Sequence, residues 1–197
     1  MVTVDNPQFI DRIRQRDPAA LETVVRLYLP QILRAARGAG LDEPAAEDAT
    51  QSTFATFIEK ADSFHGRSKV RTWLFGILYK KILEAHRETR RAQEMEDIDE
   101  VMEHRFNANG GWVKPPRQVD ATLYDTEIRE YLLECLEEVP LRQRMAFILR
   151  EVEGHGTKEI CKILDVSRTN LGAMLHRCRN RLRECLESKG IEGDYHD

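Results

Sequence analysis

Apolar residues recur at intervals of three and four along most of the chain, and this spacing limits the possible folds more than any other feature. The clearest stripe advances by four, three, four and three residues through Leu171, Leu175, Cys178, Leu182 and Cys185. Such steps place side chains on one face of an α-helix, whereas a half-buried strand alternates at every second residue. No segment shows a strand pattern, so the sequence predicts an all-α fold.

The helical pattern is interrupted once, between residues 93 and 125. Residues 94–104 hold six acids and no Lys or Arg, and the following stretch from Gly110 to Pro116 contains two glycines and two prolines, which break regular structure. A structureless loop of this length is uncommon inside one compact domain. We therefore expect two small helical domains, 1–92 and 126–190, joined by a flexible acidic linker, 93–125, and followed by a tail, 191–197.

Three main helices are expected in the first domain. Pro30 lies within the first apolar stripe, so it is expected to kink or split that helix. Asp42 is a plausible N-cap for the second helix, and a polar loop separates that helix from the third. The residues expected to face inward on the second and third helices are Phe54, Phe57, Ile58, Ala61, Val70, Trp73, Leu74, Ile77, Leu78 and Ile82.

The second domain ends in a pattern typical of a helix-turn-helix. A short helix over residues 157–164 is followed by the turn Asp165-Val-Ser167 and by a longer basic helix. Asp tolerates the left-handed conformation that such a turn needs, and Ser167 can cap the last helix. The start of that helix would reach base edges in a major groove, and its later arginines would meet phosphates. The alternative is an amphipathic helix with a basic solvent face.

Charge is strongly segregated, although the net value is only −4, from 30 Lys and Arg against 34 Asp and Glu. Residues 64–92 carry eight Lys or Arg against two acids, and residues 168–183 carry five Arg and no acid. Such asymmetry indicates surfaces that bind polyanions, with merely solvated helix faces as the other interpretation.

Other features exclude several classes of protein. No apolar run approaches the ~18 residues of a membrane span, and the N-terminus lacks the features of a signal peptide. Four cysteines are too few for a disulfide scaffold, so we expect a reduced, soluble, intracellular protein without membrane insertion.

Three other functions compete with DNA binding. A zinc site at Cys161, His176, Cys178 and Cys185 would lack the close ligand pairs usual for zinc, so no metal or other cofactor is expected. The histidines have no nucleophile or carboxylate at catalytic spacing, so an enzyme is not expected either. A repressor that binds its operator unaided would need a dimer interface or a receiver domain; tight binding of DNA by the free protein would favour it.

Several stretches resemble bacterial sigma factors. Residues 137–154, 159–167 and 175–182 are similar to region 4 of that family, residues 46–54 to region 2.2, and residues 64–87 to regions 2.3 and 2.4. Together these matches cover roughly 18–92 and 126–187. Their order and the short chain are typical of the extracytoplasmic-function class, which keeps only these two domains.

The resemblance implies a function and the residues that perform it. The chain would act in the cytoplasm and bind the beta and beta-prime subunits of core RNA polymerase. Its first domain would melt the -10 element of promoter DNA, and its second would read the -35 element. An anti-sigma factor would control it. The implied polymerase contacts are Asp48, Gln51 and Ser52. The implied -10 contacts are Phe64, His65, Gly66, Arg67, Lys69, Arg71, Lys80, Glu84 and Arg87. The implied -35 contacts are Arg168, Thr169, Asn170, Gly172, His176, Arg179 and Arg183.

Overall fold

The computed structural model describes residues 4–92 and 126–190. The expected linker 93–125 and tail 191–197 therefore lie outside the described residues. In the described part of the chain every regular element is helical, which confirms the all-α prediction. None of the helices in these two ranges combines the length and apolar character needed to cross a membrane.

The N-terminal half contains four α-helices and one short 3₁₀ turn. Their bounds are α1 Pro7–Arg14, α2 Pro18–Gly38, α3 Glu43–Glu59, η1 Ala61–Ser63 and α4 Val70–Ala92. The first three helices start in the same way, with a polar cap followed by a proline that needs no hydrogen-bond partner. Asp42 is the cap of α3, as predicted, and accepts a hydrogen bond from the Ala45 N–H at 2.9 Å.

Pro30 was expected to kink or split its helix, and the split does not occur. The helix α2 continues through Pro30, with Tyr28 and Ile32 on either side both buried in one core. Ile58 was expected to face inward but is 41% exposed. It lies in the last turn of α3, whose buried face includes Thr53 and Phe57, and an α-helix turns Ile58 about 100° away from Phe57.

The C-terminal half contains the predicted helix-turn-helix. Its elements are α5 Thr126–Glu137, α6 Leu141–Phe147, the π-helical turn η3 Ile148–Val152, α7 Thr157–Leu164 and α8 Arg168–Ser188. Asp165 is left-handed, with φ of 54°, and the hydroxyl of Ser167 accepts from the Asn170 N–H at 3.1 Å. Val152 follows the buried Ile148 and Leu149 but is 48% exposed, because the wider π turn changes the register of the helical face.

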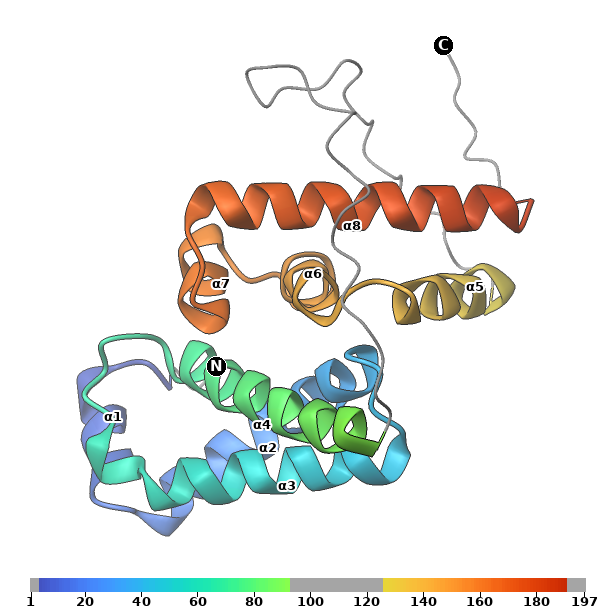
Figure 1. Cartoon of the computed structure of the whole chain (residues 1–197). Helices are drawn as coiled ribbons and strands as arrows, with labels where there is room; N and C mark the ends of the chain where they lie inside the picture. Colours follow the sequence, from blue (N-terminus) through green and yellow to red (C-terminus); the bar gives the residue numbers. More distant parts are fainter. Residues whose placement is uncertain (1–3, 93–125, 191–197) are drawn as a thin grey trace.

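The two halves pack directly on one another, with α7 lying against α4 (Figure 1). A single cluster of buried side chains runs from Val4 in the first half to Leu175 in the second. The two small, separate cores expected from the sequence are therefore joined across α4, η3 and α7. A second, smaller cluster lies between α5 and the C-terminal part of α8 and contains Leu136, Cys178 and Leu182.

The cysteines depart from the expectation of a fully reduced protein. Cys135 on α5 and Cys185 on α8 form a disulfide across the smaller cluster. Cys161 and Cys178 are free thiols, the first partly exposed and the second buried. Spacing along the chain could not reveal the pair, because its members are 50 residues apart.

Candidate nucleic-acid interface

The start of α8 presents a polar, exposed surface over an apolar base. Its outward residues are Arg168, Thr169, Asn170 and Gly172, all of which are exposed. On the inner side Leu171, Met174 and Leu175 are buried against the main core. The rigid inner face therefore fixes the direction of the side chains that the sequence predicts to meet the -35 element.

The three remaining -35 candidates lie further along α8. Arg179 Nη2 lies 2.5 Å from Glu151 Oε1 in an exposed ion pair. Partial burial and the neighbouring arginines, Arg179 first among them, lower the pKa of His176, so its ring is neutral at physiological pH. Arg183 is partly exposed one turn beyond Arg179.

The candidates on α4 divide into an exposed group and a covered group. Lys80, Glu84 and Arg87 are exposed and follow one another at steps of four and three, which places them on one helix face. Glu84 forms an ion pair with Lys81 at 2.9 Å.

The loop before α4 combines one buried and three exposed candidates. Phe64 is 4% exposed, and its ring stacks on Trp73 at a centroid distance of 4.6 Å. His65, Gly66 and Arg67 are exposed. At Gly66, φ is +67° and a Cβ would lie 2.9 Å from Ile10 Cδ1, so a larger residue would distort the loop. The Phe64 ring thus anchors the loop from inside, while the polar residues at the tip of the loop face solvent.

Lys69 and Arg71 contact the C-terminal half. Lys69 Nζ lies 2.9 Å from Glu159 Oε1. Arg71 Nη2 lies 3.0 Å from Glu153 Oε2 and donates to the Glu153 carbonyl at 2.6 Å. In this arrangement two predicted DNA contacts instead neutralise carboxylates of the other half.

Sequence reasoning missed the residues that make this junction. The Glu153 side chain has no exposed area and also pairs with Arg34 at 2.8 Å, so its charge is balanced from two sides. His155 is 2% exposed, and its ring meets the edge of Phe75 at a centroid distance of 4.6 Å. Burial, helped by the charge of Arg71, lowers the pKa of His155 to about 4. The only sequence signal was an acid, Glu153, followed by a histidine between two glycines, a pattern that ordinarily marks an exposed loop.

The candidate polymerase contacts lie on α3. Asp48, Gln51 and Ser52 are all exposed. The opposite side of α3 is buried through residues that include Thr53 and Phe57. None of the three polar residues therefore supports the core, which leaves them available to a partner.

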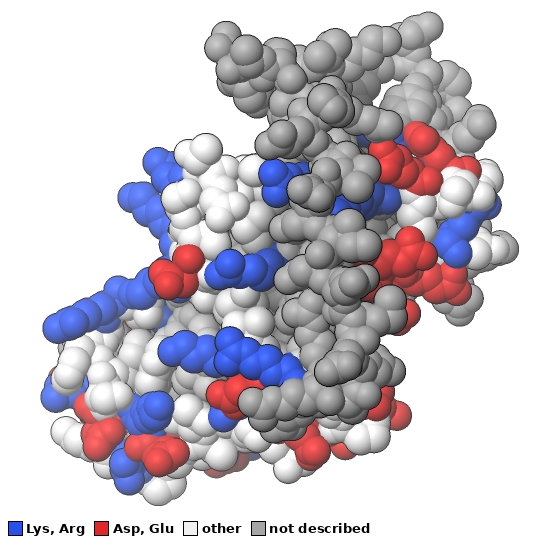
Figure 2. All heavy atoms as spheres, in the orientation of Figure 1, with Lys and Arg blue, Asp and Glu red and all other residues white. Residues whose placement is uncertain are grey.

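Figure 2 shows how charge is distributed over one face of the molecule. Lys and Arg side chains lie along the left and across the middle, with some Asp and Glu among them, and a larger group of Asp and Glu lies on the right, over the end that carries α5. This distribution of charge suits the basic side of the described surface to binding a polyanion.

Within the described residues, no group of three or more His, Cys, Asp or Glu side chains is arranged to hold a metal ion.

Comparison with known proteins identifies the class. Residues 24–92 match the family model of sigma-70 region 2, and residues 129–182 match that of sigma-70 region 4. A probable RNA polymerase sigma factor from Haemophilus influenzae is 31% identical over 153 residues, which cover 73% of this chain and 78% of the relative. The chain therefore belongs to the sigma-70 family of RNA polymerase sigma factors, which direct core polymerase to promoters.

Within that family the chain resembles the extracytoplasmic-function class. The sigma-E factor of this class from Escherichia coli is 25% identical over 175 residues, covering 88% of this chain and 90% of the relative. The fold is similar to that of CnrH, solved in complex with the cytosolic domain of CnrY, with a TM-score of 0.68, 18% identity and coverage of 93% and 98% of the two chains. It is also similar to RpoE of Bartonella quintana, solved with the anti-sigma factor NepR, with a TM-score of 0.64, 23% identity and coverage of 84% and 96%.

Proposed function

We propose that this sigma factor divides promoter recognition between its two halves, taken as domains 1–92 and 126–190. The start of α8 reads the -35 element, and the loop from Phe64 to Arg67 with α4 binds and melts the -10 element. The chain itself carries out no covalent chemistry. The loop and the basic face of α4 suit a separated strand, because flipped bases are held by a shaped pocket beside a cationic track.

One observation carries this proposal: the outward face of α8 is polar and exposed at Arg168, Thr169 and Asn170, while the helix is held from behind by buried Leu171 and Leu175. A helix-turn-helix needs this combination, since the recognition helix must enter a groove without moving on its support. A helix that merely closed a core would have no need of an exposed, acid-free N-terminal turn.

The proposal includes a polymerase contact on α3, made by Asp48, Gln51 and Ser52. We expect Asp48→Ala and Gln51→Ala each to weaken binding to core polymerase by about 5-fold, as ~1 kcal/mol is typical of a polar interface residue. Their exposure means that neither change opens a cavity.

The measurement is a titration of labelled sigma factor with core polymerase, with circular dichroism to check the fold. The matched control is Glu22→Ala, which removes an exposed acid from α2 instead of α3 and should bind polymerase normally. Unchanged affinity in both α3 variants would remove the polymerase contact from this face.

We also propose that the protein acts in the cytoplasm, beside the polymerase, and that an anti-sigma protein controls it. Support comes from the two similar structures, each of which was solved with a bound partner, in one case an anti-sigma factor. The test is affinity purification of the full chain followed by competition with core polymerase. A bound protein that prevents the polymerase from binding supports this control, and partners that all bind together with the polymerase contradict it.

A further inference from the structure

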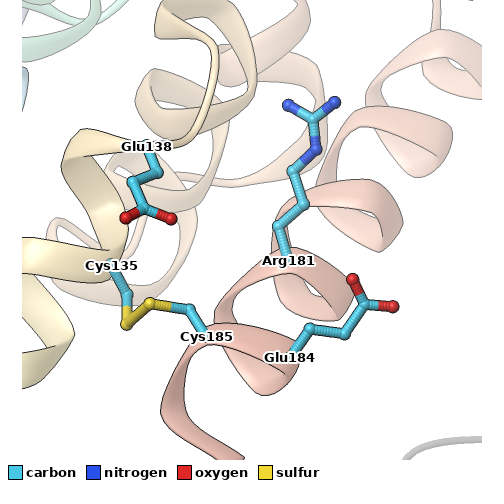
Figure 3. Close-up of a pocket in the computed structure, with 5 residues that line it drawn as sticks. All are labelled: Cys135, Glu138, Arg181, Glu184 and Cys185. Carbon is cyan, nitrogen blue, oxygen red and sulfur yellow. A yellow bond between two sulfur atoms is a disulfide. The ribbon is translucent and has the colours of Figure 1, made fainter. Parts of the chain in front are cut away.

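The disulfide between Cys135 and Cys185 lies near the C-terminal end of α8, at the far end of that helix from the proposed base-reading turn. It borders a pocket of about 270 Å³ lined by both cysteines and by Glu138, Arg181 and Glu184 (Figure 3). Cys135 is 1% exposed, whereas Cys185 is partly exposed. A small reagent in the pocket would therefore reach the sulfur of Cys185 first.

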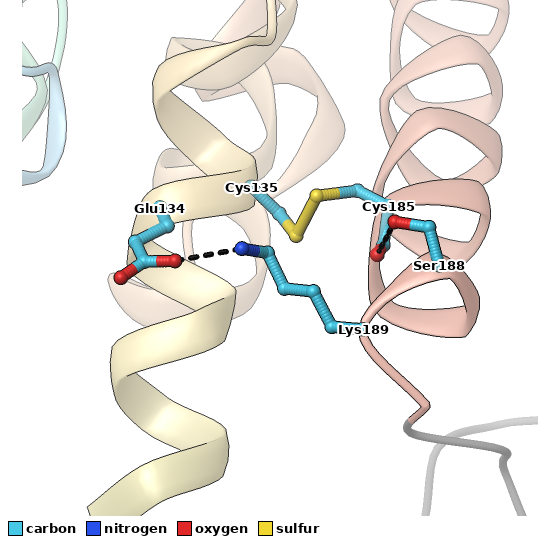
Figure 4. The surroundings of a disulfide bond; sticks show 5 residues. All are labelled: Glu134, Cys135, Cys185, Ser188 and Lys189. Carbon is cyan, nitrogen blue, oxygen red and sulfur yellow. Dashed lines mark hydrogen bonds and ion pairs between the residues drawn. A yellow bond between two sulfur atoms is a disulfide. The ribbon is translucent and has the colours of Figure 1, made fainter.

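The two helices stay together without the bond. Lys189 Nζ forms an ion pair with Glu134 at 2.8 Å (Figure 4). The same Nζ lies 5.3 Å from the centre of the Tyr131 ring. Leu136 and Leu182 pack in the cluster beneath the sulfurs. Reduced thiols would thus remain neighbours, and a bond between groups held close forms again readily.

We propose that Cys135 and Cys185 form a reversible redox site whose oxidant is a small-molecule disulfide. The Cys185 thiolate attacks that disulfide and releases one small thiol. The Cys135 thiolate then attacks Cys185 Sγ and releases the second. Two protein thiols are oxidised to one disulfide, the small disulfide is reduced to two thiols, and the protons from the cysteines end on those thiols. An excess of small thiol reverses both steps.

The bond controls one end of the C-terminal half. The base-reading turn of α8 rests on the main core through Leu171 and Leu175, whereas the later part rests on the smaller cluster through Cys178 and Leu182. Oxidation therefore stabilises α5 and the later part of α8 and leaves the base-reading turn in place.

A disulfide in a protein that works beside RNA polymerase is expected to be transient, because thiols there are kept reduced. This step rests on the proposed cytoplasmic function. The other cysteines do not compete as partners: Cys178 is buried, which raises its pKa to about 12, and Cys161 lies on α7.

The test titrates the thiols of the full chain in mixtures of reduced and oxidised glutathione, followed by alkylation and intact-mass measurement. We expect two thiols to disappear in one step, in the wild type and in the control Cys161→Ser alike, and to return with excess reduced glutathione. Peptide mapping should show a disulfide that links Cys135 to Cys185. The readout needs neither polymerase nor DNA, so it is independent of promoter recognition.

Thermal unfolding gives the second readout. The oxidised protein should melt at least ~5 °C above the reduced one, because the bond closes a long loop in a small domain. Cys185→Ser should melt at the reduced temperature under both conditions. Three results would each overturn the proposal. They are alkylation of both Cys135 and Cys185 in oxidised glutathione, a bond that excess thiol does not reopen, and equal melting temperatures of the oxidised and reduced proteins.

Discussion

At the scale of single residues, the buried Arg144 side chain donates hydrogen bonds to three backbone carbonyls. Its guanidinium donates to the carbonyl of Ala39 at 3.0 Å, to that of Val139 at 3.1 Å and to that of Glu137. Burial lowers the pKa of Arg144, yet the group remains charged at physiological pH. One side chain thus joins the end of α2 to the junction of α5 and α6.

Arg144→Met should destabilise the fold by about 2–4 kcal/mol, because it removes a buried charge-assisted donor and leaves carbonyls without their partner. The measurement is urea unfolding. Arg142→Met is the matched control: Arg142 is exposed and makes a single 3.3 Å bond to Tyr79, so its loss should cost less than ~1 kcal/mol. Equal losses in the two variants would contradict the role of Arg144.

His155 makes stability depend on pH. Its pKa is about 4 in the folded chain, against an ordinary value of 6.5. Between these values the unfolded chain holds a proton that the folded chain does not, so stability falls as pH falls through this window. From pH 7 to pH 5 the loss due to His155 should be ~2 kcal/mol.

His155→Gln, which cannot be protonated, should therefore flatten the pH dependence of urea unfolding between pH 7 and pH 5. His65→Gln is the control, since His65 is exposed on the loop before α4. If the two variants lose stability with identical slopes, His155 is not the group that titrates.

At the scale of elements, α8 separates base reading from phosphate contact along its length. Arg168 is its first residue, and Arg183 lies about four turns further on. Arg168→Ala should relax the preference at one -35 position and cost ~1–3 kcal/mol on the preferred sequence. Arg183→Ala should weaken all sequences alike and lower the salt slope by about 1. His176, further along the same face, is placed on the phosphate side.

Binding of polymerase holoenzyme to a randomised -35 element at two salt concentrations distinguishes these effects. Each variant serves as the control for the other, because both remove one arginine from the same helix. An Arg168→Ala variant that lowers every sequence equally would show that α8 meets DNA in another orientation.

Local signals predicted helix ends better than they predicted packing. The caps at Asp42 and Ser167 and the left-handed turn at Asp165 were found correctly, because each depends on a few adjacent residues. Ile58 was misplaced because helical spacing does not show how far around α3 the neighbouring helices cover it. All the candidate -35 residues at the start of α8 proved exposed, whereas Phe64 proved buried, since its position depends on Trp73.

At the scale of the whole molecule, the contact between the halves could not be predicted. It depends on Glu153 meeting Arg71, 82 positions earlier in the chain, and Arg34, 119 positions earlier, and on Glu159 meeting Lys69. No local pattern carries such pairings. If Arg71 contacts promoter DNA, as predicted, we expect the halves to separate first at this junction.

Glu153→Gln should favour that separation. The change keeps the shape of the side chain but leaves Arg34 and Arg71 without their buried counter-charge, which typically costs several kcal/mol. We expect a larger radius of gyration in solution scattering and at least ~10-fold tighter binding of a single-stranded -10 oligonucleotide by the free protein. Glu151→Gln, an exposed acid of the same turn, is the control. If neither variant binds the oligonucleotide more tightly and both remain folded, the junction does not limit access to DNA.

The most direct test of promoter-directed function is run-off transcription by purified core polymerase on a promoter library, with and without this protein. We expect specific transcripts only when the protein is present, from templates that share one -35 and one -10 element, and none when either element is scrambled. Initiation that is the same with and without the protein, together with tight and specific DNA binding by the free protein, would contradict a sigma factor and indicate a repressor.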